Sequence, residues 1–151
     1  ISGDRTQHLL WRIENGNFDH ILPEVIVLMI GTNNLNANSA IEIAEGIEAV
    51  VNKLRTTVPE SKILLLGIFP RGEQPEDPFR QKIKNINESI SHLNDDNHIF
   101  YRDIGKIFLY PDGAANKTLM SDDCLHLRPA GYEAWAKAIA PFLKQMGIDT
   151  K

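Results

Sequence analysis

The sequence predicts an α/β domain built on a parallel sheet, and two observations lead to this fold class. Residues 25–31 and 62–70 are continuous apolar runs, typical of strands that are buried on both faces. Segments with helical periodicity lie between and after these runs, and residues 98–105 indicate a weaker third strand. This alternation is typical of parallel strands that are joined by right-handed crossovers.

Each expected helix has a recognisable start. Ser39 is followed three residues later by Glu42, the pattern of a capping box, and an apolar stripe continues from there. The Asp77–Pro78 pair supplies a cap and a first-turn proline for a second helix. Pro129 begins the last helix, and residues 7–14 form a short amphipathic one. The predicted order is therefore helix, strand, helix, strand, helix, strand, helix.

The composition describes one ordinary globular domain over residues 1–151 and excludes several classes of function. The 151 residues are 42% hydrophobic and 24% charged, with a net charge of -4 and no basic stripe, so we expect no nucleic-acid partner. No apolar run reaches the ~20 residues that a membrane helix needs. Cys124 is the single cysteine, which excludes a disulfide framework and slightly favours a cytoplasmic location. No histidine or cysteine spacing suggests a metal site.

Ligands of open α/β sheets bind beyond the carboxyl ends of the strands. Three segments should meet there: residues 31–34 after the first strand, 70–79 after the second, and the loop from 103 to 126 after the third. Catalytic residues are therefore expected in these segments.

Asp123 and His126 are three residues apart, just before the last helix. Histidine is the commonest general base near neutral pH, and a carboxylate bound to its far ring nitrogen orients the ring and stabilises the cation. A tight turn would bring Asp123 to the ring. The alternative is a loop aspartate that caps a turn beside a surface histidine, and spacing alone favours that alternative.

Asn33 and Gly3 are two further candidates. Asn33 follows a glycine at the end of a buried strand, where a side-chain amide can donate to a developing oxyanion. The alternative is an asparagine-rich turn. Gly3 offers a free backbone N–H, and its alternative is a plain turn before a helix, with Asp4 as the cap.

Taken together and in this order, Gly3, Asn33 and the Asp123-x-x-His126 motif resemble the SGNH (GDSL-type) hydrolases. The stretches "SGDRTQHLLWRIENG", "IVLMIGTNN", "ILLLGIFPRGEQP" and "DCLHLRPAGY" run in family order and cover nearly the whole chain. Within this superfamily the sequence is most similar to the catalytic subunits of platelet-activating-factor acetylhydrolase and their bacterial relatives.

The resemblance implies a three-layer, flavodoxin-like fold with helices on both faces of the sheet. It also implies cleavage of esters through a serine nucleophile, without a metal or an organic cofactor. In that scheme His126 is the general base and Asp123 is its orienting partner.

The same resemblance assigns the remaining site residues. Gly3, through its backbone N–H, and Asn33, through its side-chain amide, would be the oxyanion-hole donors. Thr32 and Leu125 flank these groups and would be expected to line the acyl pocket. Cys124 lies inside the motif, and we interpret it as a small buried apolar residue.

The sequence departs from the family at the nucleophile. The family carries it in a Gly-Asp-Ser motif at the end of the first strand, and this chain has no such motif. Ser2 precedes the oxyanion glycine, and the other serines lack a strand-end setting: Ser39, Ser61, Ser89, Ser91 and Ser121. The chain therefore resembles the C-terminal portion of a hydrolase that lacks its N-terminal strand–helix–strand.

The missing strand would lie beside residues 25–31 and would leave them as an apolar edge. Three explanations stay open. The chain is a fragment of a longer product, the missing segment lies elsewhere or in a complementing chain, or the protein is a shortened relative that assembles without it. The best-known members of the family dimerise, so a homodimer is one candidate assembly, by analogy alone.

Two functions are consistent with the sequence. The first is a serine esterase for short acyl or acetyl esters, with its nucleophile outside this chain, so that the isolated chain is inactive. The alternative is an inactive SGNH-like protein that binds acylated ligands or a protein partner. Lipid acetyl esters and acetylated carbohydrates are both compatible with the family.

Overall fold

The computed structural model describes residues 3–148. In chain order the elements are the helix α1 (Thr6–Glu14), the strand β1 (Val25–Leu28), the 3₁₀ helix η1 (Thr32–Asn34), the helix α2 (Ala40–Thr57), the strand β2 (Lys62–Leu66), the helix α3 (Pro78–Ser91), the strand β3 (Ile99–Arg102), the 3₁₀ helix η2 (Gly105–Phe108) and the helix α4 (Pro129–Gln145).

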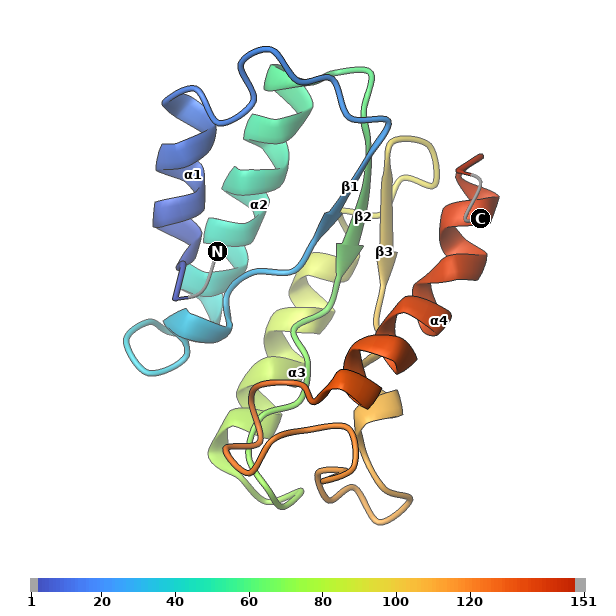
Figure 1. Ribbon diagram of the computed structural model, residues 1–151. Helices are drawn as coiled ribbons and strands as arrows, with labels where there is room; N and C mark the ends of the chain where they lie inside the picture. The colour runs from blue at the N-terminus through green and yellow to red at the C-terminus, as the bar shows by residue number, and fades with distance from the viewer. Residues whose placement is uncertain (1–2, 149–151) are drawn as a thin grey trace.

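The three strands form a parallel sheet in the order β1-β2-β3, with Val27 opposite Leu64 and Leu64 opposite Phe100. Helices α1, α2 and α3 pack on one face and α4 lies on the other (Figure 1). The predicted three-layer α/β fold with a parallel sheet and helices on both faces is therefore confirmed.

The position of β2 in the middle of the sheet explains the apolar run that begins at residue 62. Four consecutive residues of β2, from Ile63 to Leu66, are no more than 1% exposed, because helices cover both faces of the sheet at this strand. Burial of one such side chain contributes about 1.5–3 kcal/mol. A strand in this position can carry apolar residues at every position instead of at alternate ones.

The helix starts follow the predicted chemistry, with one exception. Ser39 Oγ accepts from the backbone N–H of Glu42, and the Glu42 carboxylate accepts from the Ser39 N–H, so the capping box is confirmed. The exception is α1, whose N-cap is Arg5 and not Asp4. The Asp4 carboxylate instead pairs with the guanidinium of Arg12, with Nε and Oδ2 3.0 Å apart.

The outer edge of β3 is closed by the turn that precedes the strand. The Ile99 N–H donates to Asp95 Oδ1 at 2.7 Å, and the Ile99 carbonyl accepts from the Asp95 N–H at 3.0 Å. The Tyr101 N–H donates to Asn94 Oδ1 at 2.8 Å. These bonds occupy the groups that another strand would otherwise pair with.

The outer edge of β1 has no such cover in the described chain. The ladder to β2 begins with the Lys62 N–H donating to the Glu24 carbonyl, so alternate residues from Glu24 onward face β2. Val25 and Val27 face outward, and no hydrogen bond within residues 3–148 involves their outward backbone groups. The Val27 side chain is 40% exposed. This edge could accept another strand.

Candidate active site

The loop before α4 brings Asp123 and His126 into contact. Asp123 Oδ2 lies 2.6 Å from His126 Nδ1, and Oδ1 accepts from the backbone N–H of Leu125 and of His126, both at 3.0 Å. The turn closes where the Ser121 N–H donates to the His126 carbonyl at 2.8 Å. One carboxylate therefore fixes both the backbone and the ring of the histidine.

The electrostatics favour a charged Asp123. The hydrogen bond from the His126 ring, followed by those from the two backbone N–H groups, lowers the pKa of Asp123 to about 2. The His126 side chain is 65% exposed, so its ring is open to a group that approaches from solvent. An ionised carboxylate on Nδ1 sets the tautomer in which Nε2 is free to accept a proton.

The second group of candidates lies at the end of β1. Asn33 belongs to η1, and its side-chain Nδ2 donates to the Asp4 carbonyl at 2.9 Å. This bond brings Asn33 beside the segment that begins with Gly3, which has a left-handed φ of 81°. Gly31 has a φ of 112°, and the turn it makes directs η1 away from the strand.

Asn34 holds these two segments together, and the sequence analysis did not single it out. Its side chain is buried, its Oδ1 accepts from the Thr6 N–H at 3.0 Å, and its Nδ2 donates to Gln7 Oε1 and Asn38 Oδ1, both at 3.0 Å. The start of α1 is thereby fixed to η1. The second asparagine of "TNN" was visible in the sequence, but nothing in it distinguished the buried residue from its neighbour.

Arg80 fixes the loop that follows β2, and it was also missed. Its guanidinium donates to the carbonyls of Arg71 and Gly72 at 2.9 Å and of Gly113 at 3.1 Å. Burial lowers the pKa of Arg80. One side chain on α3 thus joins the loop after β2 to the loop that leads towards Asp123.

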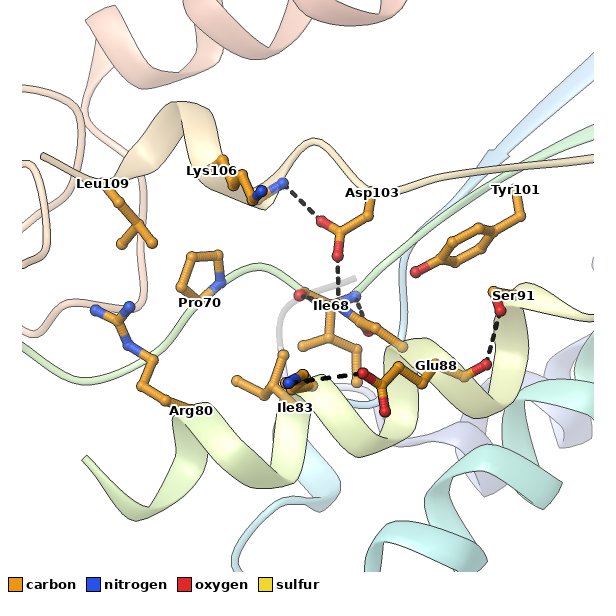
Figure 2. A pocket seen from close by; sticks show the side chains of 13 residues that line it. Ile68, Pro70, Arg80, Ile83, Glu88, Ser91, Tyr101, Asp103, Lys106 and Leu109 are labelled. Carbon is orange, nitrogen blue, oxygen red and sulfur yellow. Dashed lines mark hydrogen bonds and ion pairs between the residues drawn. The ribbon is translucent and has the colours of Figure 1, made fainter. Parts of the chain in front are cut away.

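A cavity of about 530 Å³ lies beside Arg80, which is one of its lining residues (Figure 2). It opens between α3 and the segment that follows β3, and its walls include Ile68, Ile83 and Tyr101. None of the predicted site residues lines it. The candidate catalytic groups therefore lie on a more open part of the surface.

The candidate site consists of two groups, Gly3 with Asn33 and Asp123 with His126. Within residues 3–148 no hydrogen bond links Gly3 or Asn33 to Asp123 or His126. The two predicted pocket residues lie one beside each group. Thr32 accepts a hydrogen bond from Arg71 through its carbonyl, and Leu125 donates through its N–H to Asp123.

Cys124 is buried, at 4% exposed, and packs in the core cluster on the α4 face. Its sulfur also accepts from Lys117 Nζ at 3.0 Å, and this contact raises the pKa of Lys117. Lys117 lies 3.4 Å from a carboxylate oxygen of Glu73 as well. The loop that carries Asp123 and His126 is therefore tied to the loop after β2 through one lysine.

A family model described as the GDSL-like lipase/acylhydrolase family matches residues 1–134. The chain belongs to this family. Among curated proteins it is 41% identical over 151 residues to platelet-activating factor acetylhydrolase IB subunit alpha2 of Rattus norvegicus. It is 35% identical over 147 residues to subunit alpha1 of Homo sapiens. The chain covers 65% and 62% of the length of these two relatives.

Solved structures share the fold of this GDSL-family chain. An acetyl xylan esterase, AlAXEase, aligns with a TM-score of 0.77 at 24% identity, covering 95% of this chain and 78% of the other. A GDSL-like lipase from Bacteroides thetaiotaomicron aligns with a TM-score of 0.74 at 20% identity, covering 96% and 73%.

Three serines of this GDSL-family chain have structural roles. Ser39 caps α2, the Ser61 hydroxyl donates to the Pro23 carbonyl, and the Ser91 hydroxyl donates to the Glu88 carbonyl. Ser2 lies outside the described residues.

None of the helices in residues 3–148 is both long and apolar enough to cross a membrane. The same residues contain no group of three or more histidine, cysteine, aspartate or glutamate side chains that could hold a metal ion.

Proposed function

We propose that this protein is a serine-type carboxylic ester hydrolase in which Asp123 and His126 form the acid–base pair. The observation that carries the proposal is the 2.6 Å contact between Asp123 Oδ2 and His126 Nδ1, in a chain of the GDSL family. This is the geometry that a histidine base needs in order to take a proton from a hydroxyl nucleophile.

In the proposed mechanism His126 Nε2 accepts the proton of the attacking serine and later delivers it to the leaving alcohol. Asp123, ionised because its pKa is lowered to about 2, stabilises the imidazolium that forms between these steps. The carboxylate keeps its charge throughout, since its partner carries the proton.

The developing oxyanion is held by Asn33 and Gly3. An amide nitrogen has two N–H donors, and Asn33 uses one of them on the Asp4 carbonyl. That bond orients the amide, and its second N–H is available to the oxyanion together with the backbone N–H of Gly3. Thr32 and Leu125 line the acyl pocket on either side.

The nucleophile comes from a segment outside residues 1–151 that adds a strand to the open edge of β1. The contrast between the two sheet edges supports this proposal: Asn94 and Asp95 close the β3 edge, whereas Val25 and Val27 are left open. The segment belongs either to the same polypeptide or to a complementing chain, and a homodimer is the further arrangement to be tested.

Short acyl esters, above all acetyl esters, are the proposed substrates. The names of similar proteins support this, since they include acetylhydrolases and an acetyl xylan esterase. Hydrolysis assays with a lipid acetyl ester and with an acetylated carbohydrate will show which of the two carries the acetyl group.

The test uses the protein expressed from its full coding sequence. We expect hydrolysis of 4-nitrophenyl acetate and covalent labelling of one serine by a fluorophosphonate. An Asp123→Ala/His126→Ala variant should lose both, and residues 1–151 expressed alone should show no turnover. Full activity in the double variant would refute the roles of Asp123 and His126. Robust turnover by a chain whose mass confirms that it contains residues 1–151 alone would refute the assignment of the nucleophile.

The alternative is a family member that binds acylated ligands or a protein partner without cleaving an ester. It is motivated by one observation, that residues 1–151 contain no Gly-Asp-Ser motif. Binding of an acylated ligand by a full-length protein that the fluorophosphonate leaves unlabelled would support it.

A further inference from the structure

The cavity of about 530 Å³ between α3 and the segment after β3 has an apolar floor. Ile68 and Ile83 are only 1% and 5% exposed, and Pro70 and Leu109 extend the apolar surface towards η2 (Figure 2). A concave surface of this size with apolar walls and a few polar groups is typical of a site for a small organic molecule. None of the candidate catalytic residues lines it, so it is a second site.

The wall formed by Asn87 is fixed by hydrogen bonds. Its Oδ1 accepts from the Ile68 N–H at 2.8 Å, and its Nδ2 donates to the Ile68 carbonyl at 3.0 Å and to Asp103 Oδ2 at 3.3 Å. Gly67 leaves room for this arrangement, because a Cβ atom there would lie 2.8 Å from Asn87 Nδ2 and 2.9 Å from the Tyr101 hydroxyl. This wall of the cavity is therefore in place before a ligand arrives.

Two carboxylates line the cavity, and both already have partners. Asp103 accepts from the Gly105 N–H at 2.9 Å through Oδ1 and from Asn87 at 3.3 Å through Oδ2. Glu88 lies 3.8 Å from the ammonium group of Lys84, one turn earlier on α3. The acidic groups of the cavity are thus engaged within the protein.

The cationic groups are less fully engaged. Arg80, Lys84 and Lys106 line the cavity, and within residues 3–148 no ion pair of 4.0 Å or less includes Arg80 or Lys106. The Arg80 guanidinium has five N–H donors and makes three hydrogen bonds, all to neutral backbone carbonyls. Burial lowers the pKa of Arg80, so an anion beside it would offset the cost of burying its charge. The balance of charge and of spare donors favours an anionic ligand.

Pro70 brings these two cations to the same part of the cavity. Arg80 donates to the carbonyl of Arg71, the residue after Pro70. A Cβ atom at Gly105, the residue before Lys106, would lie 2.9 Å from Pro70 Cδ. Figure 2 shows Pro70 between Arg80 and Lys106. The cations therefore lie next to the apolar floor and not on a distant rim.

We propose that this cavity binds a carboxylate that carries an apolar tail of medium length. The carboxylate accepts hydrogen bonds from Arg80 and Lys106, and the tail covers Ile68 and Ile83. The site is separate from the proposed ester hydrolysis and does not depend on it.

Four probes test the site by calorimetry and NMR with the protein expressed from its full coding sequence: acetate, butyrate, octanoate and octylammonium. We expect octanoate to bind, and octylammonium, whose tail is as long but whose charge is opposite, to bind at least tenfold more weakly. From butyrate to octanoate the affinity should rise by up to about fourfold for each methylene that is buried. Nuclear Overhauser contacts between the octanoate tail and the methyl groups of Ile68 and Ile83 should place the ligand in the cavity.

Two variants of Lys106 test the cationic end. Lys106 is exposed, so its replacement should not disturb the fold. Lys106→Gln should weaken octanoate binding about threefold to tenfold, the loss of one exposed charge-assisted hydrogen bond, and Lys106→Glu should weaken it further. Lys137→Gln, which removes the same charge from the exposed side of α4, should leave the affinity unchanged.

Each alternative outcome overturns the proposal in a different way. Equal affinities for acetate and octanoate would show that the cations bind any small anion and that the tail finds no site. Octylammonium binding as tightly as octanoate would show that charge does not select the ligand. Contacts from the octanoate tail to the His126 ring instead of to the two isoleucines would assign the ligand to the candidate active site. The absence of octanoate binding at millimolar concentrations would refute the site. None of these readouts requires esterase activity.

Discussion

The carboxylate of Asp123 holds His126 at two points. Oδ2 meets the ring Nδ1 at 2.6 Å, while Oδ1 accepts from the backbone N–H of the same residue at 3.0 Å. The aspartate thus fixes where the histidine lies and how its ring is turned. Both contacts favour the ionised carboxylate, which is why the pKa of Asp123 is lowered to about 2.

A titration of Asp123 checks this relationship. We expect its carboxyl carbon, followed by NMR, to titrate near pH 2 in the wild type. In His126→Ala the largest cause of the lowered pKa is removed, so the midpoint should move up towards the ordinary value of about 3.9. An unchanged midpoint in His126→Ala would show that the ring does not bind the carboxylate in solution.

The same lowered pKa predicts how stability depends on pH. The folded state favours the ionised Asp123, so this contribution to stability is fully present above about pH 4, near the unfolded pKa. It is lost as the pH falls towards about 2. Both side chains are largely exposed, so the effect should be small. The difference in unfolding free energy between the wild type and Asp123→Asn should therefore shrink as the pH falls from about 4 to about 2. A difference that stays constant over this pH range would show that the ionisation of Asp123 does not contribute to stability.

Asn33→Ala tests the oxyanion role in the full-length protein. Removal of one oxyanion donor typically costs about 10²–10³ in kcat, and we expect a loss of that size with 4-nitrophenyl acetate. The matched control is Asn36→Ala, an exposed asparagine in the same loop. A loss in Asn33→Ala no larger than in Asn36→Ala would exclude Asn33 from the reaction.

Much of the fold could be predicted because continuous apolar runs indicate strands that are buried on both faces. The runs at 25–31 and 62–70 extend beyond the strands, which end at Leu28 and Leu66. Residues such as Ile68 and Phe69 stay buried after β2 has ended, and the sequence alone cannot separate them from a continuing strand. Helix starts were easier, because Ser39 and Asp77 act on backbone groups only a few residues away.

Contacts around the candidate site could be predicted where they are local and not where they are distant. Asp123 and His126 are three residues apart, so a turn can join them. Asn34 bonds to Gln7 across 27 positions, and Arg80 bonds to Gly113 across 33. A single sequence does not reveal such pairs, since neither partner has a distinctive neighbourhood.

Asn34→Ala should destabilise the protein more than Asn36→Ala does. Asn34 is 2% exposed, and its removal leaves the N–H of Thr6 buried without its acceptor. A buried group left unsatisfied costs about 1–3 kcal/mol, which urea unfolding at equilibrium can resolve. Equal urea midpoints for the two variants would mean that water takes over the hydrogen bonds of the lost Asn34 amide.

Gly31→Ala should be destabilising for two reasons that a control can separate. Gly31 has a φ of 112°, and a Cβ atom there would lie 2.9 Å from Ile68 and 3.0 Å from Ile43. Gly147 also has a positive φ, 85°, but its Cβ would meet nothing within 4 Å. Gly147→Ala therefore reports backbone strain alone, on the order of 1 kcal/mol. Gly31→Ala should cost clearly more in urea unfolding, and an equal cost would show that the neighbouring isoleucines can move aside.

Val27→Lys tests the open edge of β1 in residues 1–151. The unpaired backbone groups beside Val27 should let two chains associate edge to edge, and a lysine on an edge strand opposes such pairing. Because the Val27 side chain is 40% exposed, a lysine can reach solvent without unfolding the strand. Sedimentation velocity at increasing concentration should show association of the wild type and about tenfold weaker association of the variant, the effect of ~1.4 kcal/mol. Thr57→Lys, which adds the same charge at the end of α2, should associate like the wild type. A wild-type chain that stays monomeric at every concentration would show that the edge is protected in solution.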